Sequence, residues 1–107
     1  MNLRELLIYD FGVDFPIYGG NGNSIDNPIV IERTLINDYV GTEYAILKYL
    51  GIGRGIEWKT IGQQLLGHND KLIDKIKIET KEITPTQIIT QVENYYFDIS
   101  ECLNDLG

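Results

Sequence analysis

The sequence predicts an α+β fold, in which an antiparallel sheet of three to four strands forms a meander with a helix at one or both chain ends packed on one face. Three observations support this prediction: an alternating stretch near the middle, a turn-like tetrapeptide before it, and helical spacing of apolar residues near the C-terminus. The 107 residues are expected to form one domain, 1–107, because a chain of this length buries a single core.

The best strand pattern lies in residues 72–80. Apolar residues and a threonine fall on one face of an extended chain and charged residues on the other: Leu72, Ile76, Ile78 and Thr80 against Lys71, Lys75, Lys77 and Glu79. This alternation is typical of a strand with one buried and one wet face. Residues 56–66 form a second extended candidate, and Gly67-His68-Asn69-Asp70 between them has the composition of a hairpin turn. We therefore predict a β-hairpin here.

Residues 42–52 fit two structures. Val40, Tyr44, Leu47 and Gly51 align on a helix, whereas Tyr44, Ile46, Leu50 and Ile52 align on one side of a strand. Tyrosine and isoleucine favour the strand, so residues 42–81 are expected to form a three-stranded meander. A loop over 19–28, rich in glycine and asparagine, precedes a short strand at Ile29-Val30-Ile31.

Helices are expected near both ends. Thr84-Pro85 offers an N-cap followed by proline at the first helical position, and helical spacing follows at Ile88, Ile89, Val92 and Tyr96. A further helical turn is expected over 99–103. Residues 3–9 fit a helix or a strand, and the helix is expected.

The charge is acidic and uneven. The net charge is −7; residues 1–47 and 82–107 are acidic, whereas residues 48–81 hold seven bases and four acids. This balance argues against nonspecific nucleic-acid binding and favours a basic protein partner. No apolar run is long enough to span a bilayer or to act as a signal peptide, and the single Cys102 excludes an internal disulfide, so a cytoplasmic protein is expected.

Few residues are candidates for catalysis or for binding a metal or cofactor. His68 is interpreted as an exposed turn residue and Cys102 as a small buried apolar one, so neither predicts a nucleophile with its base. The spacing of zinc, calcium, dinucleotide and P-loop sites is missing, and Gly51–Gly55 is interpreted as a flexible turn. We expect no enzyme, no metal and no cofactor.

The tyrosines that lie near acidic residues in the sequence are the strongest indication of a protein-binding surface. Tyrosine and tryptophan are enriched at the energetic centres of interfaces, and acidic rims attract basic partners. The candidate partner-binding residues are Asp10, Asp14, Tyr18, Asp26, Asp38, Tyr39 and Glu43. The alternative is that the tyrosines are half-buried core residues with wet hydroxyl groups. Trp58 is expected in the core.

Several short motifs stand out between residues 14 and 80. They are the stretch from Phe15 through Gly22, then Asp26 and Ile29–Glu32, then Val40-Gly41 with Glu43-Tyr44, Glu57-Trp58-Lys59, and Asp74. Together these motifs resemble small bacterial immunity proteins of polymorphic or contact-dependent toxin systems. The resemblance covers residues 14–80. It implies a cytosolic protein that binds a cognate toxin domain and neutralises it, with no cofactor and no reaction. The alternatives are an interaction or adaptor domain of a larger bacterial assembly, and a small ligand-binding protein.

Overall fold

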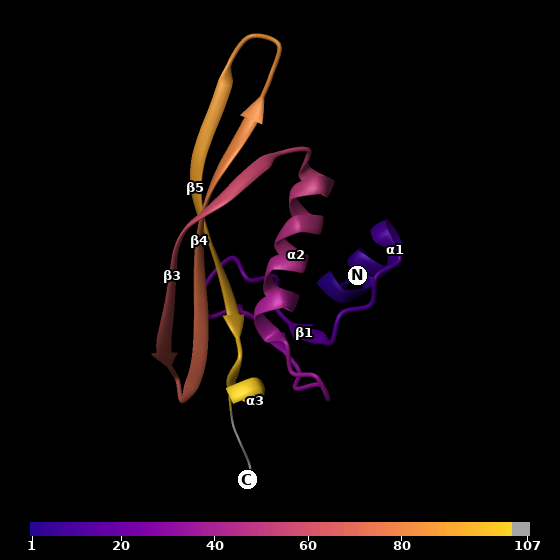
Figure 1. Cartoon of the computed structure of the whole chain (residues 1–107), viewed down its shortest axis with the longest axis vertical. Helices are drawn as coiled ribbons and strands as arrows, with labels where there is room; N and C mark the ends of the chain where they lie inside the picture. The colour runs from indigo at the N-terminus through magenta and orange to yellow at the C-terminus, as the bar shows by residue number, and fades with distance from the viewer. Residues whose placement is uncertain (104–107) are drawn as a thin grey trace.

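The computed structural model describes residues 1–103 and confirms the α+β class (Figure 1). Along these residues run α1 (Leu3–Phe11), β1 (Ile17–Gly19), β2 (Ile29–Ile31), α2 (Tyr39–Arg54), β3 (Glu57–His68), β4 (Lys71–Ile83), β5 (Ile88–Asp98) and α3 (Ser100–Leu103). The described strands form one five-stranded sheet in the order β1-β2-β5-β4-β3, rather than three to four strands. Its pairs are antiparallel except β2 with β5, which is parallel.

The predicted β3–β4 hairpin is confirmed. The strands pair from Glu57 opposite Lys81 down to His68 opposite Lys71. Asn69 and Asp70 form the connection with positive φ values of 51° and 61°, which asparagine and aspartate tolerate better than most residues. Two central residues with positive φ match the twist of the flanking strands, so this turn sets the register.

The preference for a strand over 42–52 is wrong, because this segment lies in helix α2. Asp38 caps the helix by accepting a hydrogen bond from the Gly41 N–H at 3.0 Å, and Gly55 ends it with φ 67°. The helix buries the face that carries Glu43, Ile46, Leu47 and Gly51. Packing of that face on the sheet outweighs the strand propensity of isolated tyrosine and isoleucine residues.

The helix expected after Thr84-Pro85 is also wrong. Thr84 Oγ1 accepts hydrogen bonds from the N–H groups of Thr86 and Gln87, at 3.4 and 3.0 Å, which closes a four-residue hairpin loop instead of capping a helix. The following strand β5 pairs with β4 from Ile88 to Asp98. The meander is therefore β3-β4-β5 rather than 42–81.

Two shorter helix predictions hold at the chain ends. Helix α1 covers 3–11, and Asn2 and Glu5 form a reciprocal capping box at its start. The helical turn expected over 99–103 is α3, and Cys102 within it is buried as expected.

The core lies between α2 and one face of the sheet (Figure 1). Alternate residues of β4 point toward α2, including Ile76 and Ile78, and their neighbours in β5 continue this face. Trp58, expected in the core, is half-buried at the margin of the core. There its ring stacks on the ring of Tyr44, with 6.4 Å between the ring centroids. The core residues are Leu7, Ile17, Ile29, Ile31, Ile46, Leu47, Ile76, Ile78, Phe97, Ile99 and Cys102.

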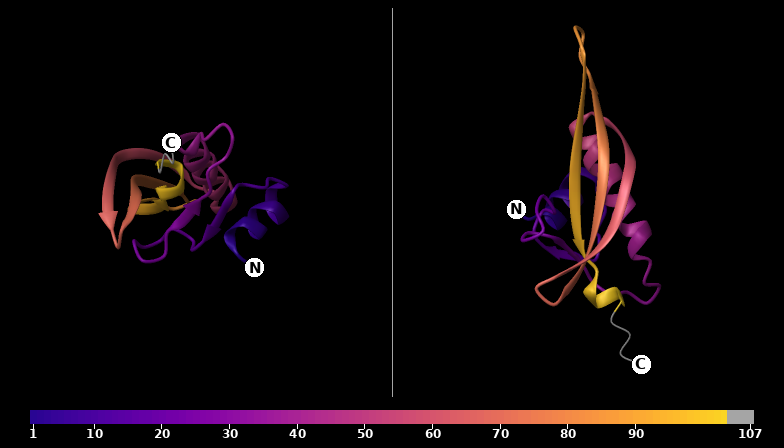
Figure 2. Two further views of the ribbon diagram at one scale, coloured as in Figure 1. Left: turned by 90° about the horizontal axis from the view of Figure 1, so that it is seen from below. Right: turned by 90° about the vertical axis from the view of Figure 1, so that its left-hand side faces the viewer.

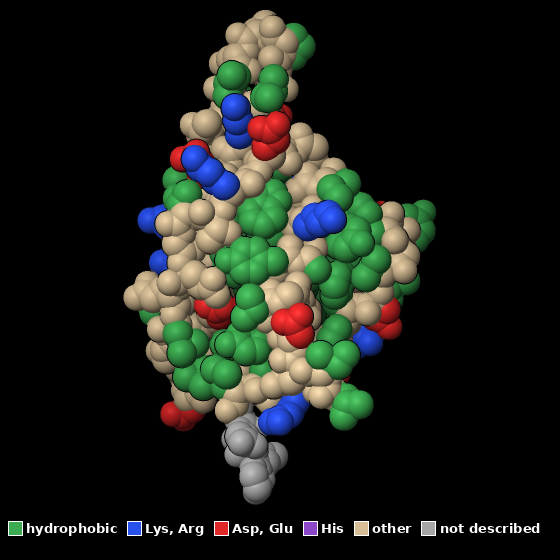
Figure 3. Space-filling model, viewed as in Figure 1, with side chains coloured by type: hydrophobic (Ala, Val, Ile, Leu, Met, Phe, Trp, Pro, Cys, Tyr) green, Lys and Arg blue, Asp and Glu red, His purple; other side chains and the backbone are tan. Residues whose placement is uncertain are grey.

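The β4–β5 hairpin extends beyond the rest of the molecule (Figure 2). Strand β3 pairs with β4 as far as Lys81, so residues 82–89, which we call the arm, form a two-stranded ribbon. The principal extents of the described chain, 55 × 29 × 23 Å, reflect this projection. Figure 3 shows hydrophobic side chains over the body and charged ones where the arm leaves it.

The loop between β1 and β2 covers one end of the sheet face opposite α2. Its Gly22 carbonyl accepts a hydrogen bond from the Tyr96 N–H at 2.9 Å, and its Asp26 lies 2.9 Å from Nε2 of His68. Ile73, which alternates with the core-facing residues of β4, is fully buried there. Within residues 1–103, none of the helices has the length and apolarity required to cross a membrane.

Candidate functional site

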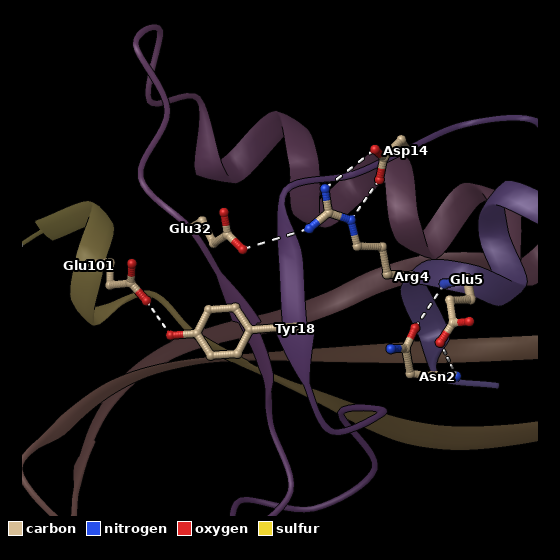
Figure 4. Close-up of polar contacts among 7 residues, drawn as sticks. All are labelled: Asn2, Arg4, Glu5, Asp14, Tyr18, Glu32 and Glu101. Carbon is tan, nitrogen blue, oxygen red and sulfur yellow. Dashed lines mark hydrogen bonds and ion pairs between the residues drawn. The ribbon is translucent and has the colours of Figure 1, made fainter.

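Tyr18 on the edge strand β1 lies beside Glu101 and Glu32, and Arg4 links Glu32 to Asp14 (Figure 4). Asp14 precedes β1, Glu32 follows β2, and Glu101 lies in α3. The Tyr18 side chain is 50% exposed, so its ring forms part of the surface. We call Asp14, Tyr18, Glu32 and Glu101 the Tyr18 patch.

Arg4 of α1 ties two of these carboxylates to the body of the protein. Its Nε donates to Asp14 at 2.6 Å and its Nη2 donates to the same carboxylate at 3.3 Å. Its Nη1 lies 3.7 Å from a carboxylate oxygen of Glu32 (Figure 4). Because a guanidinium fork orients a carboxylate in its plane, Arg4 fixes the direction of Asp14.

Glu101 fixes the direction of the Tyr18 side chain, because the Tyr18 hydroxyl donates a hydrogen bond to its carboxylate. That bond, partial burial and the nearby charges of Glu101, Asp98 and Glu32 raise the pKa of Tyr18 to about 12. The Tyr18 hydroxyl therefore stays protonated at neutral pH. By contrast, the hydrogen bond from Arg4 lowers the pKa of Asp14, which keeps that carboxylate charged.

This arrangement suits the binding of cations on a protein surface. The exposed ring of Tyr18 offers an apolar face over which a lysine or arginine can lie, and the carboxylates around it can accept hydrogen bonds from such a group. The patch combines an oriented aromatic ring with negative charge, as expected of an anchor for a basic partner.

Five of the seven residues predicted for partner binding lie outside the patch. Asp10 is exposed in the last turn of α1, and Asp26 pairs with His68, which is half-buried at the end of β3 rather than an exposed turn residue. Asp38 caps α2, and Tyr39 packs half-buried against the core, where burial raises its pKa.

The fifth, Glu43, has no exposed surface, so in this conformation it does not contact a partner. It lies beside the buried Asp74 of β4. Gln63 Nε2 donates to Asp74 at 2.8 Å, and the Tyr44 hydroxyl donates to Gln63 Oε1 at 3.0 Å. Burial, with a contribution from Asp74, raises the pKa of Glu43 to about 10, so a protonated Glu43 is buried at the contact between α2 and the sheet.

A hollow of about 410 Å³ lies where α1, the loop after β1, α2 and β5 meet, and it is the feature that a small-molecule site would use. Three asparagines contribute to its wall, and Asn94 Oδ1 has no hydrogen-bond partner among residues 1–103. The lining residues are Leu3, Asn21, Asn23, Leu50, Glu93, Asn94 and Tyr95.

Within residues 1–103, no three His, Cys, Asp or Glu side chains are grouped to hold a metal ion. The thiol of Cys102 points to the carbonyl oxygens of Ile31 and Glu32, at 3.6 and 3.8 Å. Burial is the main reason that the pKa of this thiol is raised.

Sequence reasoning missed Glu32 and Glu101 as parts of the Tyr18 patch, and Arg4 as the residue that orients Asp14. The sequence marks residues 82–107 only as acidic overall, and Tyr18 and Glu101 lie 83 positions apart. Their contact depends on the parallel pairing of β2 with β5, which brings α3 next to β1. Comparison of this chain with protein-family models, curated proteins and solved structures finds no match, so its function is inferred from the geometry of its own residues.

Proposed function

We propose that this chain is an immunity protein that binds a toxin domain through the Tyr18 patch and neutralises it. The supporting observation is the half-exposed Tyr18 ring, held by Glu101 among carboxylates from separate segments. The toxin domain presents a basic surface to this patch, with a lysine or arginine against the ring of Tyr18.

The proposed contact agrees with the motif resemblance, since Tyr18 belongs to the Phe15–Gly22 stretch on which that resemblance depends. Binding at this edge of the sheet needs little rearrangement, because Arg4 already orients Asp14 and Glu101 already orients Tyr18. Preorganised side chains lose less conformational entropy on binding, which favours a tight complex.

The first test is capture of the native partner by the tagged full chain, at about 50 mM and 500 mM salt. The expected result is one tightly bound partner that carries a toxic domain. Its binding should weaken at 500 mM salt, where interactions between exposed charges are screened beyond about 4 Å. A partner from a housekeeping assembly, or no partner at all, would overturn the immunity function and favour the adaptor alternative.

The second test places the contact. The double variant Y18A/E101Q is expected to weaken toxin binding by at least about tenfold, since it removes an anchor and a charge at the centre of the patch. The matched control is Y9A, because Tyr9 is a 79% exposed tyrosine on α1 outside the patch. Equal loss of binding in both variants, or in neither, would refute the placement.

A further inference from the structure

The sheet face that points away from α2, which we call the open face, is basic. In β4, lysines alternate with the core-facing Ile76 and Ile78, and in β3 Lys59 lies opposite Glu79 on the same side. Five of the nine Lys and Arg residues of the chain share this face: Lys59, Lys71, Lys75, Lys77 and Lys81. Positive charge is therefore concentrated on one face of a chain whose net charge is −7.

Two acidic residues of the open face, Glu79 opposite Lys59 and Glu57 opposite Lys81, compensate part of this charge. Lys59 Nζ lies 3.6 Å from Glu79, and the Lys59 side chain keeps 70% of its surface exposed. Lys75 Nζ lies over the ring of Tyr96 at 6.0 Å. Lys77 and Lys81 are exposed, so their ammonium groups are accessible to a partner.

An aliphatic cluster continues the open face onto the arm. Ile83 lies opposite Ile88, and Val92 stands on the same side of β5. Their exposed fractions are 62%, 60% and 54%, so the cluster has no cover within the described chain. A hollow of about 350 Å³ lies where β3 meets the base of the arm, and it is lined by Glu57, Trp58, Lys59, Glu79, Lys81 and Thr90.

We propose that the open face is a second interaction surface, which binds an acidic protein segment that also carries aliphatic side chains. The lysines pair with carboxylates of that segment, and its aliphatic residues cover Ile83, Ile88 and Val92. A nucleic-acid backbone fits less well, because the phosphates gain nothing from the aliphatic cluster and are repelled by the net charge. A second copy fits less well too, because two open faces would oppose the same excess of lysines.

This surface is separate from the Tyr18 patch. The patch lies at β1, one edge of the sheet, whereas the lysines lie on β3 and β4 at the other edge. The inference does not rest on the proposed function, and the two surfaces have opposite charge. One chain could then hold a basic partner at β1 and an acidic partner on the open face.

The test is a nitrogen-15 NMR titration of the full chain with a synthetic twelve-residue peptide that alternates glutamate with valine. We expect saturable shifts in β3, β4 and β5 around Lys77, Lys81 and Val92, with a Kd of about 1 mM or tighter. A peptide with lysine in place of glutamate, and a twelve-nucleotide single-stranded DNA, serve as competing ligands. Tighter binding of either one, shifts centred on Tyr18, or no shifts would overturn the proposal.

Charge reversal gives an independent readout. K77E/K81E is expected to weaken peptide binding at least tenfold, because it replaces two lysines at the centre of the face by acids. K48E reverses one lysine at an exposed position of α2, away from the open face, and is expected to alter the Kd by less than about twofold. Equal affinities for the wild-type chain and K77E/K81E would refute the assignment of the lysines. Dimerisation of the free chain, seen by sedimentation at the titration concentration, would assign the face to a second copy instead.

Discussion

Replacing Glu43 by glutamine removes a carboxyl group from the core while keeping the size of the side chain. Glu43 is fully buried between α2 and the sheet, and neither of its oxygens has a hydrogen-bond donor within reach among the described residues. Its neighbour Asp74 already accepts a hydrogen bond from Gln63. A glutamine at position 43 can offer an N–H to Asp74 without having to take up a proton.

The size of the effect follows from the pKa of Glu43, which burial and Asp74 raise from 4.5 to about 10. Between these two values the folded chain holds a proton that the unfolded chain releases, so the free energy of unfolding falls as pH rises. Each pH unit costs about 1.4 kcal/mol, and pH 7.5 lies three units above 4.5. The free energy of unfolding of E43Q minus that of the wild type is therefore expected to be up to about 4 kcal/mol larger at pH 7.5 than at pH 4.

Urea unfolding of both proteins from pH 4 to pH 9 measures this difference. The free energy of unfolding of E43Q minus that of the wild type should rise steadily above pH 4.5. The matched control E82Q removes an exposed carboxylate from β4 and should change stability by less than about 0.5 kcal/mol. A difference between E43Q and the wild type that stays constant from pH 4.5 to pH 7.5 would refute the buried, protonated Glu43.

Two further predictions concern the contacts of α2. A Cβ at Gly51 would lie 2.8 Å from Trp58 Cδ1. The free energy of unfolding of G51A, measured in urea, should therefore be about 1–3 kcal/mol lower than that of the wild type, despite the better helix propensity of alanine. At Gly53 the nearest atom to a Cβ would be at 3.6 Å, so the free energy of unfolding of G53A should be about 0.5–1 kcal/mol higher than that of the wild type. Changes of the same sign in both variants would contradict this reasoning. Arg54 donates two 2.7 Å hydrogen bonds to Glu93 at a partly exposed site. R54M should therefore lower the free energy of unfolding by about 1 kcal/mol, and by less in 1 M NaCl. A decrease of the same size at both salt concentrations would assign the effect to packing.

The sequence by itself determined the features that depend on neighbouring residues. The alternation in 72–80 and the Asn69-Asp70 turn specify the β3–β4 hairpin, because the strand period and the turn type are local properties. The aliphatic run of β2 was predicted as a strand for the same reason. The acidic balance and the tyrosines near acids pointed to Tyr18 and Asp14, but not to the residues that hold them.

The tertiary structure decided the rest. Residues 42–52 fit two local structures, and residues 88–96 were predicted as a helix; in both segments the partners that they meet decided the structure. Segment 42–52 buries Glu43 and Leu47 as a helix, and segment 88–98 completes the ladder of β4 as a strand. The Tyr18 patch and the open face likewise join residues from distant segments, such as Tyr18 with Glu101. Long-range pairing of strands sets these contacts, and a local pattern does not contain the identity of a distant partner.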